Sequence, residues 1–192
     1  MEKMKELALK IYALAKELII NPRAFWKSNA DQKETQDELF KNLLFPLLGT
    51  VASAVFLGEF FRSDYFRIWI ALLWVIREVL LFAALWFVGI YGTKEIIKYF
   101  GYDVKVDALQ KLVTYSLIPF LLVSMITGLF PFFKFLDIFG IYGFYIFLMG
   151  GRRLLLLPKE IRDNLMLKIM AANWLVFGLL SFTTAKLLML LD

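Results

Sequence analysis

The uncharged stretch from Leu112 to Phe133 is the feature that most restricts the fold of this chain. It runs for 22 residues and is followed, after a short turn, by a second apolar run from Ile138 to Gly151. An uncharged apolar run of about 18 or more residues is long enough to cross the hydrocarbon core of a bilayer as a helix. The sequence therefore predicts a membrane protein.

Three further apolar runs bring the expected number of membrane spans to five. Hydrophobic residues make up 60% of the 192-residue chain, whereas soluble domains contain roughly 45–50%. We predict an all-α integral membrane protein, with a cytosolic portion over residues 1–42 and a five-helix transmembrane domain over residues 43–192. The expected spans cover about residues 43–61, 68–92, 112–131, 134–151 and 169–191.

Residues 1–20 have the spacing of an amphipathic helix. Apolar residues recur at steps of three and four from Met4 to Leu18, and the charged residues lie away from this stripe. Such a helix either packs against the rest of the protein or lies flat among lipid headgroups. We expect an interfacial helix on the cytosolic surface, ended by Pro22, which cannot donate a backbone hydrogen bond. The aromatic pair Phe25-Trp26 just after it is expected to anchor in the membrane interface.

The distribution of Lys and Arg predicts the orientation of the spans. Residues 1–42, 93–111 and 150–168 hold 17 of the 22 basic residues, and the loops between them hold three. Because basic residues gather on the cytosolic side, we expect the amino terminus in the cytosol and the carboxyl terminus outside. This orientation signal explains the net charge of +5, so we expect no nucleic-acid partner.

Several short motifs lie over roughly residues 21–190. In chain order they are Asn21-Pro22-x-x-Phe25-Trp26, Pro46 with Gly49, Tyr115-Ser-Leu-Ile-Pro119, Gly140-Ile-Tyr142-Gly143-Phe-Tyr145, Gly150-Gly151 and Leu157-Pro158-Lys159-Glu160. Together they resemble those of the Yip-domain family, the Ypt/Rab-interacting membrane proteins. The resemblance implies a cytosolic amino terminus and five membrane helices, in agreement with the charge distribution.

The resemblance also carries expectations about location and partners. Eukaryotic members lie in endoplasmic reticulum and Golgi membranes, contact prenylated Rab GTPases and help to shape or sort vesicles. Their Asp-Leu-Tyr-Gly-Pro-Leu-Trp-like segment has no counterpart here, and Asp37-Glu38-Leu39-Phe40 is the nearest stretch. We therefore expect the prokaryotic branch and a prokaryotic cytoplasmic membrane, with a Rab-type GTPase as partner only if the host is eukaryotic.

The strongest candidate site is Arg77-Glu78, about nine residues inside the second span. A charged residue at a helix centre costs about 2.5–3.5 kcal/mol and faces the bundle interior. Neighbouring residues point about 100° apart on a helix, so we expect the two charges to neutralise each other poorly and to need other partners. Matching depths at about 1.5 Å per residue brings hydroxyls from the other spans to this level. They are Ser53, Ser124, Tyr142, Tyr145 and the stretch from Ser181 to Thr184.

Three interpretations of Arg77-Glu78 remain open from the sequence. The pair forms a buried polar knot that fixes helix register, or it lines a pocket filled by water or a lipid headgroup. Alternatively, the span boundaries are misplaced and residues 64–77 form an outer interfacial helix.

Enzyme chemistry finds little support in the sequence. The chain has no His and no Cys, which removes the commonest general base and most metal ligands, and no hydrolase or phosphate-loop motif is present. We expect no catalytic residue, metal or cofactor. Arg152, Arg153 and Lys159 either contact anionic headgroups or act only as an orientation signal.

The leading functional hypothesis is a non-enzymatic, Yip-like membrane protein that organises membranes or recruits partners. Its expected partners are membrane lipids, further copies of itself or other membrane proteins. The alternative is a small transporter, channel or lipid-translocating protein that uses the Arg77-Glu78 site. A polar path from that site to either surface would favour the alternative, whereas a closed, dry network would favour the first hypothesis.

Overall fold

The computed structural model describes residues 2–189, and these residues form helices and no strand. Five continuous helical stretches, two of them made of several of the elements named below, are long and apolar enough to cross a membrane. This confirms the predicted all-α membrane fold. The elements are α1 (Glu2–Ile20), α2 (Pro22–Asn29), α3 (Gln36–Leu39), η1 (Phe40–Leu44), α4 (Phe45–Leu57), η2 (Gly58–Phe61), α5 (Ile68–Tyr99), α6 (Val106–Leu129), η3 (Pro131–Ile141), α7 (Tyr142–Leu154) and α8 (Lys159–Met189).

The candidate spans are longer than the apolar runs that predict them. They cover Gln36–Phe61, Ile68–Tyr99, Val106–Leu129, Pro131–Leu154 and Lys159–Lys186. The helices extend past the apolar runs because charged residues such as Lys94 and Lys98 end a hydrophobic run without ending a helix. The first span begins early because Thr35 and Glu38 form a reciprocal capping box, which satisfies the first free backbone amides.

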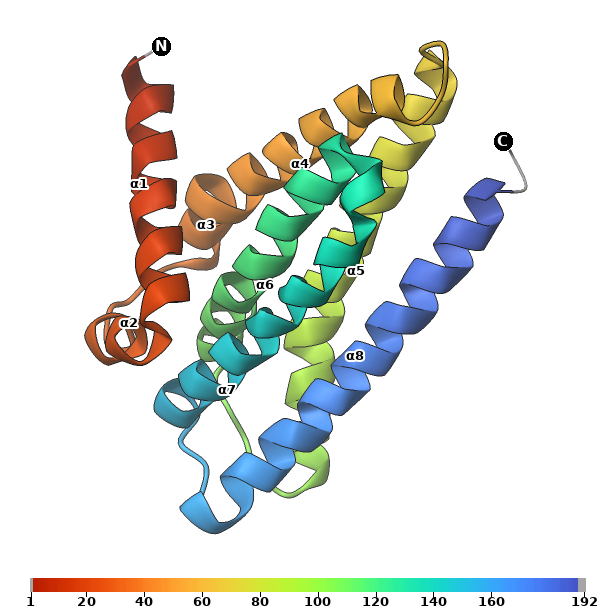
Figure 1. The fold of residues 1–192 in the computed structure, drawn as a ribbon. Coiled ribbons are helices and arrows are strands. Elements are labelled where there is room, and N and C mark those ends of the chain that lie inside the picture. Colours follow the sequence, from red (N-terminus) through yellow and green to blue (C-terminus); the bar gives the residue numbers. More distant parts are fainter. Residues whose placement is uncertain (1, 190–192) are drawn as a thin grey trace.

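The long helices form a bundle, and the loops that join them lie at its two ends (Figure 1). We call the end that carries α2, the α5–α6 loop and the α7–α8 loop the basal end. The opposite end, with the α4–α5 loop and the turn from α6 into η3, is the far end.

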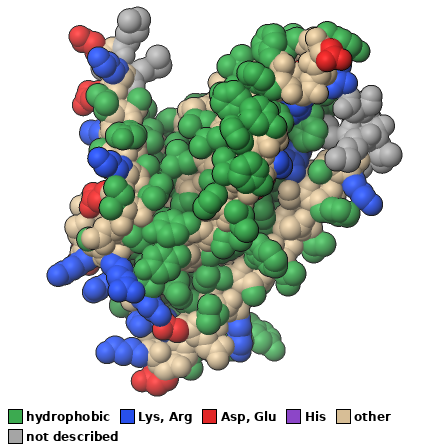
Figure 2. Space-filling model, viewed as in Figure 1, with side chains coloured by type: hydrophobic (Ala, Val, Ile, Leu, Met, Phe, Trp, Pro, Cys, Tyr) green, Lys and Arg blue, Asp and Glu red, His purple; other side chains and the backbone are tan. Residues whose placement is uncertain are grey.

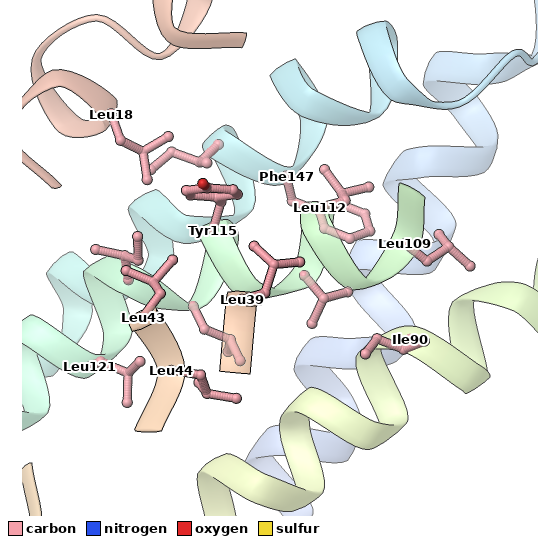
Figure 3. Packing of buried hydrophobic residues seen from close by; sticks show 14 of the residues in the cluster. Leu18, Leu39, Leu43, Leu44, Ile90, Leu109, Leu112, Tyr115, Leu121 and Phe147 are labelled. Atoms are coloured by element: carbon pink, nitrogen blue, oxygen red, sulfur yellow. The ribbon is translucent and has the colours of Figure 1, made fainter. Parts of the chain in front are cut away.

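Helix α6 forms the centre of the bundle. Every residue from Leu109 to Pro119 is buried, and Leu112, Tyr115 and Leu121 project into a cluster shared with α4 and α7 (Figure 3). Small residues allow the closest approach: a Cβ on Gly58 would stand 1.9 Å from the carbonyl oxygen of Gly128. Gly58 and Gly128 therefore let η2, at the end of the first span, pack directly against the end of α6.

Helix α1 stands beside the bundle and does not lie across its basal end (Figure 1). Ala15 and Leu18 of its apolar stripe are buried, whereas the charged side chains that the structure describes in α1 are exposed along the outer edge (Figure 2). Asn21 then caps α2, accepting a hydrogen bond from the backbone amide of Ala24, and Pro22 occupies the first turn of α2. The headgroup location of α1 stays a prediction.

Candidate functional site

Arg77 and Glu78 form a direct ion pair in α5, contrary to the expectation that adjacent residues neutralise each other poorly. Nη1 of Arg77 lies 2.6 Å from Oε2 of Glu78, and the two residues are 9% and 8% exposed. The 100° between adjacent Cβ directions separates the stems of the side chains. The long arginine side chain bridges this separation because its guanidinium lies several bonds from the backbone.

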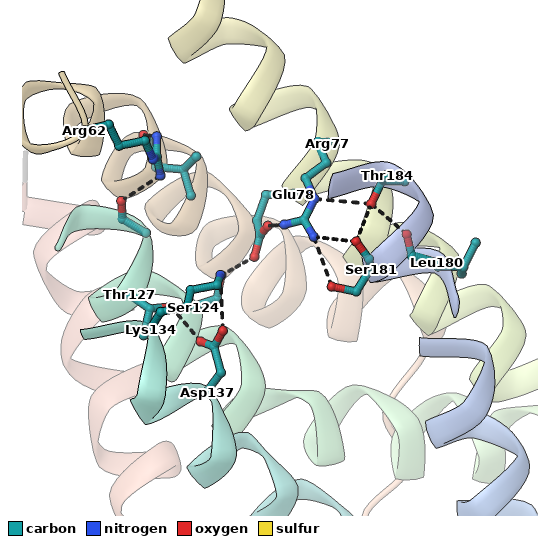
Figure 4. A network of polar contacts seen from close by, with 12 residues as sticks. Arg62, Arg77, Glu78, Ser124, Thr127, Lys134, Asp137, Leu180, Ser181 and Thr184 are labelled. Carbon is teal, nitrogen blue, oxygen red and sulfur yellow. Dashed lines mark hydrogen bonds and ion pairs between the residues drawn. The ribbon is translucent and has the colours of Figure 1, made fainter. Parts of the chain in front are cut away.

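Hydroxyl groups from two other helices complete the coordination of this pair (Figure 4). In α8, Nη2 of Arg77 donates to the carbonyl oxygen of Ser181 at 3.1 Å and to its Oγ at 3.0 Å, and Nε donates to Oγ1 of Thr184 at 3.2 Å. In α6, the hydroxyl of Ser124 donates to Oε1 of Glu78. Each guanidinium nitrogen and each carboxylate oxygen therefore has a partner inside the protein. We call these five residues the polar knot.

Two arginines contact the ring of Trp74, which links the polar knot to the far end. The guanidinium of Arg62 lies 5.0 Å from the indole centre and that of Arg77 lies 5.8 Å away. Arg62 also donates to the carbonyl oxygens of Val55 and Gly128, each at 3.3 Å. These two hydrogen bonds fasten the α4–α5 loop to α4 and α6. Burial lowers the pKa of Arg62 from its usual value.

Three of the hydroxyl residues predicted at this site lie elsewhere. Ser53 is exposed and donates to the carbonyl oxygen of Gly49 at 2.9 Å. The hydroxyl of Tyr142 donates to the carbonyl oxygen of Ile19 in α1 at 2.9 Å, and Tyr145 lies against Tyr142 with ring centres 5.5 Å apart. Depth matching fails for these residues because rise along a helix fixes the height of a side chain but not its direction around the bundle.

A second polar cluster lies at the basal end, where no site is predicted from the sequence. Lys111, 3% exposed, donates to the carbonyl oxygens of Asn29 and Gln32 and pairs with Oε2 of Glu34 at 2.9 Å. The hydroxyl of Tyr115 donates to Oε1 of Glu34 at 2.8 Å. We call these five residues the basal latch. They fasten the segment between α2 and α3 onto α6. The only sign of this cluster in the sequence is Lys111, which directly precedes a predicted span.

The aromatic pair before the first span was predicted to anchor in the membrane interface, and this prediction is wrong. Phe25 and Trp26 are 1% and 0% exposed. The indole nitrogen of Trp26 donates to the carbonyl oxygen of Ile146 at 3.1 Å. Gly150 provides the space, since a Cβ there would stand 2.6 Å from the indole ring. The motif at residues 21–26 and Gly150 of the second motif thus form one packing interface between α2 and α7, whereas Gly151 faces Met166 of α8.

The family can now be assigned. A model of the Yip1 domain matches residues 16–183, nearly the whole chain. The chain belongs to the Yip1 domain family. This confirms the predicted resemblance, while membership of a prokaryotic branch stays a prediction. No curated protein and no solved structure matches the chain.

The basic residues at the end of α7 and the start of α8 divide into two groups in this Yip1 family member. Arg152 forms a two-point ion pair with Asp163, with Nε to Oδ1 at 3.0 Å and Nη2 to Oδ2 at 2.7 Å, which joins the end of α7 to the start of α8. Arg153 and Lys159 are exposed at the basal end. The donors of Arg152 that face Asp163 are already used. Headgroup contact stays a prediction for Arg153 and Lys159.

Proposed function

We propose that this Yip1 family member is a non-catalytic membrane protein that organises the membrane and recruits partners at its basal end. We also propose that the basal end faces the cytosol. The 17-to-3 division of basic residues between the alternate segments of the chain supports this orientation. The family assignment supports a membrane role for the whole chain.

The observation that carries the proposal is the closed state of the polar knot. A transport site needs polar groups that are available to its cargo. Here the donors and acceptors of Arg77 and Glu78 are matched to each other and to Ser124, Ser181 and Thr184. Such a network holds helices in register, which is a structural task.

Reconstitution into sealed liposomes tests this proposal. We expect the protein to change vesicle diameter or clustering in proportion to its density in the membrane. We expect ion leak and lipid translocation between leaflets to match those of protein-free vesicles. The matched control is the double variant Arg77→Met/Glu78→Leu, which should change vesicle shape as the wild type does. Protein-dependent flux that this double variant abolishes would overturn the proposal in favour of a transporter.

A further inference from the structure

An open groove separates α1 from α4 and α6 on the flank of the bundle. Its volume is about 660 Å³, within the range of about 300–1,000 Å³ that ligand pockets occupy. The upper part of α1 stands apart from the bundle where the groove lies (Figure 2). The principal apolar lining residues are Leu7, Ile11 and Ile19 of α1, Leu47 of α4, and Leu122 and Met125 of α6.

The groove is apolar except at one edge. The hydroxyl of Thr50 donates to the carbonyl oxygen of Pro46 at 2.9 Å and is therefore already used. No acidic side chain that the structure describes lines the groove. Lys16, about one turn before the basal end of α1, is exposed, and among the described residues it has no ion-pair partner. The groove thus combines an apolar channel with a single cation near the basal end.

The position of α1 keeps this groove from closing. The hydroxyl of Tyr142 holds the carbonyl oxygen of Ile19 at 2.9 Å, which fastens the basal end of α1 to α7. Away from this bond the α1 side chains that face the groove include Ala8 and Ala15, which are too small to fill it. The side of α1 that carries Glu6, Lys10 and Glu17 is exposed.

We propose that this groove binds one anionic phospholipid, with an acyl chain along the apolar channel and the phosphate at Lys16. The groove opens on the flank of the membrane spans, where lipid chains are the surrounding medium, and its charge complements a phosphate. This inference rests on the proposed function only for the placement of the spans in a membrane. It names the lipid class that the proposed function leaves open.

Native mass spectrometry of the protein released from equimolar phosphatidylglycerol and phosphatidylcholine tests the inference. We expect the wild type to retain one phosphatidylglycerol in preference to phosphatidylcholine. Lys16→Gln should reduce this preference about fivefold, which corresponds to the ~1 kcal/mol that one cation near a membrane surface contributes. The matched control is Lys10→Gln, because Lys10 is exposed on the same helix and does not line the groove.

A second pair of variants tests the channel itself. Ala8 lines the groove and Ala13 does not, although both are exposed. Ala8→Trp should abolish retention of both lipids, and Ala13→Trp should leave it unchanged, with circular dichroism showing equal helix content. The inference is overturned if Lys16→Gln and Lys10→Gln have equal effects, or if Ala8→Trp still retains lipid. Lipid retention is measured separately from vesicle shape and flux, so failure of this inference and failure of the proposed function can be told apart.

Discussion

Removal of one charge from the polar knot should destabilise the bundle more than removal of both. Arg77→Met leaves the Glu78 carboxylate buried with only the hydroxyl of Ser124, and Glu78→Gln leaves the guanidinium without its anion. Removing one partner of a buried ion pair costs about 3–5 kcal/mol. We therefore expect each single variant to lower the free energy of unfolding by about this amount.

The double variant Arg77→Met/Glu78→Leu loses the four hydrogen bonds that join α5 to α6 and α8. Interhelical hydrogen bonds in membranes average about 0.6 kcal/mol, which gives a loss of about 2 kcal/mol. The released hydroxyl of Thr184 keeps a bond to the carbonyl oxygen of Leu180 at 2.7 Å. The double variant should therefore be more stable than either single variant, since no unpaired charge stays buried.

Tryptophan fluorescence during unfolding in mixed micelles measures these free energies. Arg153→Met is the matched control, because Arg153 is exposed at the basal end and its loss should change stability little. If the single variants are as stable as the wild type, the polar knot is a hydrated pocket. If the double variant is as unstable as the single variants, burial of an unpaired charge is not the dominant cost. Either result would refute the reasoning.

Three further predictions concern the basal end and the topology. Lys111→Met should expose the segment between α2 and α3 to limited proteolysis, because Glu34 and two carbonyl groups lose their donor, whereas Lys105→Met at an exposed position should not. Gly150→Val should lower stability by about 1–3 kcal/mol in thermal unfolding through overpacking against the indole of α2, and a milder loss than the same change at an open helix position would contradict the packing. A reporter active only in the cytosol should be silent after Asp192 and active in the α5–α6 loop, and an active carboxyl-terminal fusion would refute the orientation.

The sequence predicts the number and order of spans because the length of each apolar run depends only on the order of residues along the chain. It also predicts that Arg77 and Glu78 need partners, and that residues near 181–184 reach their depth. It fails on Ser53 and Tyr142, because the rotation of each helix about its axis depends on packing that a single sequence does not display. The prediction of an interfacial position for Trp26 fails for the same reason, because its burial depends on Gly150, more than a hundred residues away.

The basal latch shows a different gap. In the sequence, Lys111 cannot be told apart from other basic residues beside a span. Its partners are two backbone carbonyl oxygens and a glutamate in an irregular segment. Backbone acceptors carry no sequence signature. Burial of Lys111 could therefore be found only from the arrangement of the segment between α2 and α3 in space.

The pairing of neighbouring residues within α5 has a consequence for how the chain enters the membrane during synthesis. Helix α8 follows α5 in the chain, so α5 is made before Ser181 and Thr184 exist as partners. Because Arg77 and Glu78 pair within one helix, the two charges inside this span cancel before α8 is present. When α8 packs against α5, it adds hydrogen bonds to a charge pair that is already neutral. The packing of α8 therefore does not need to supply a counterion for Arg77.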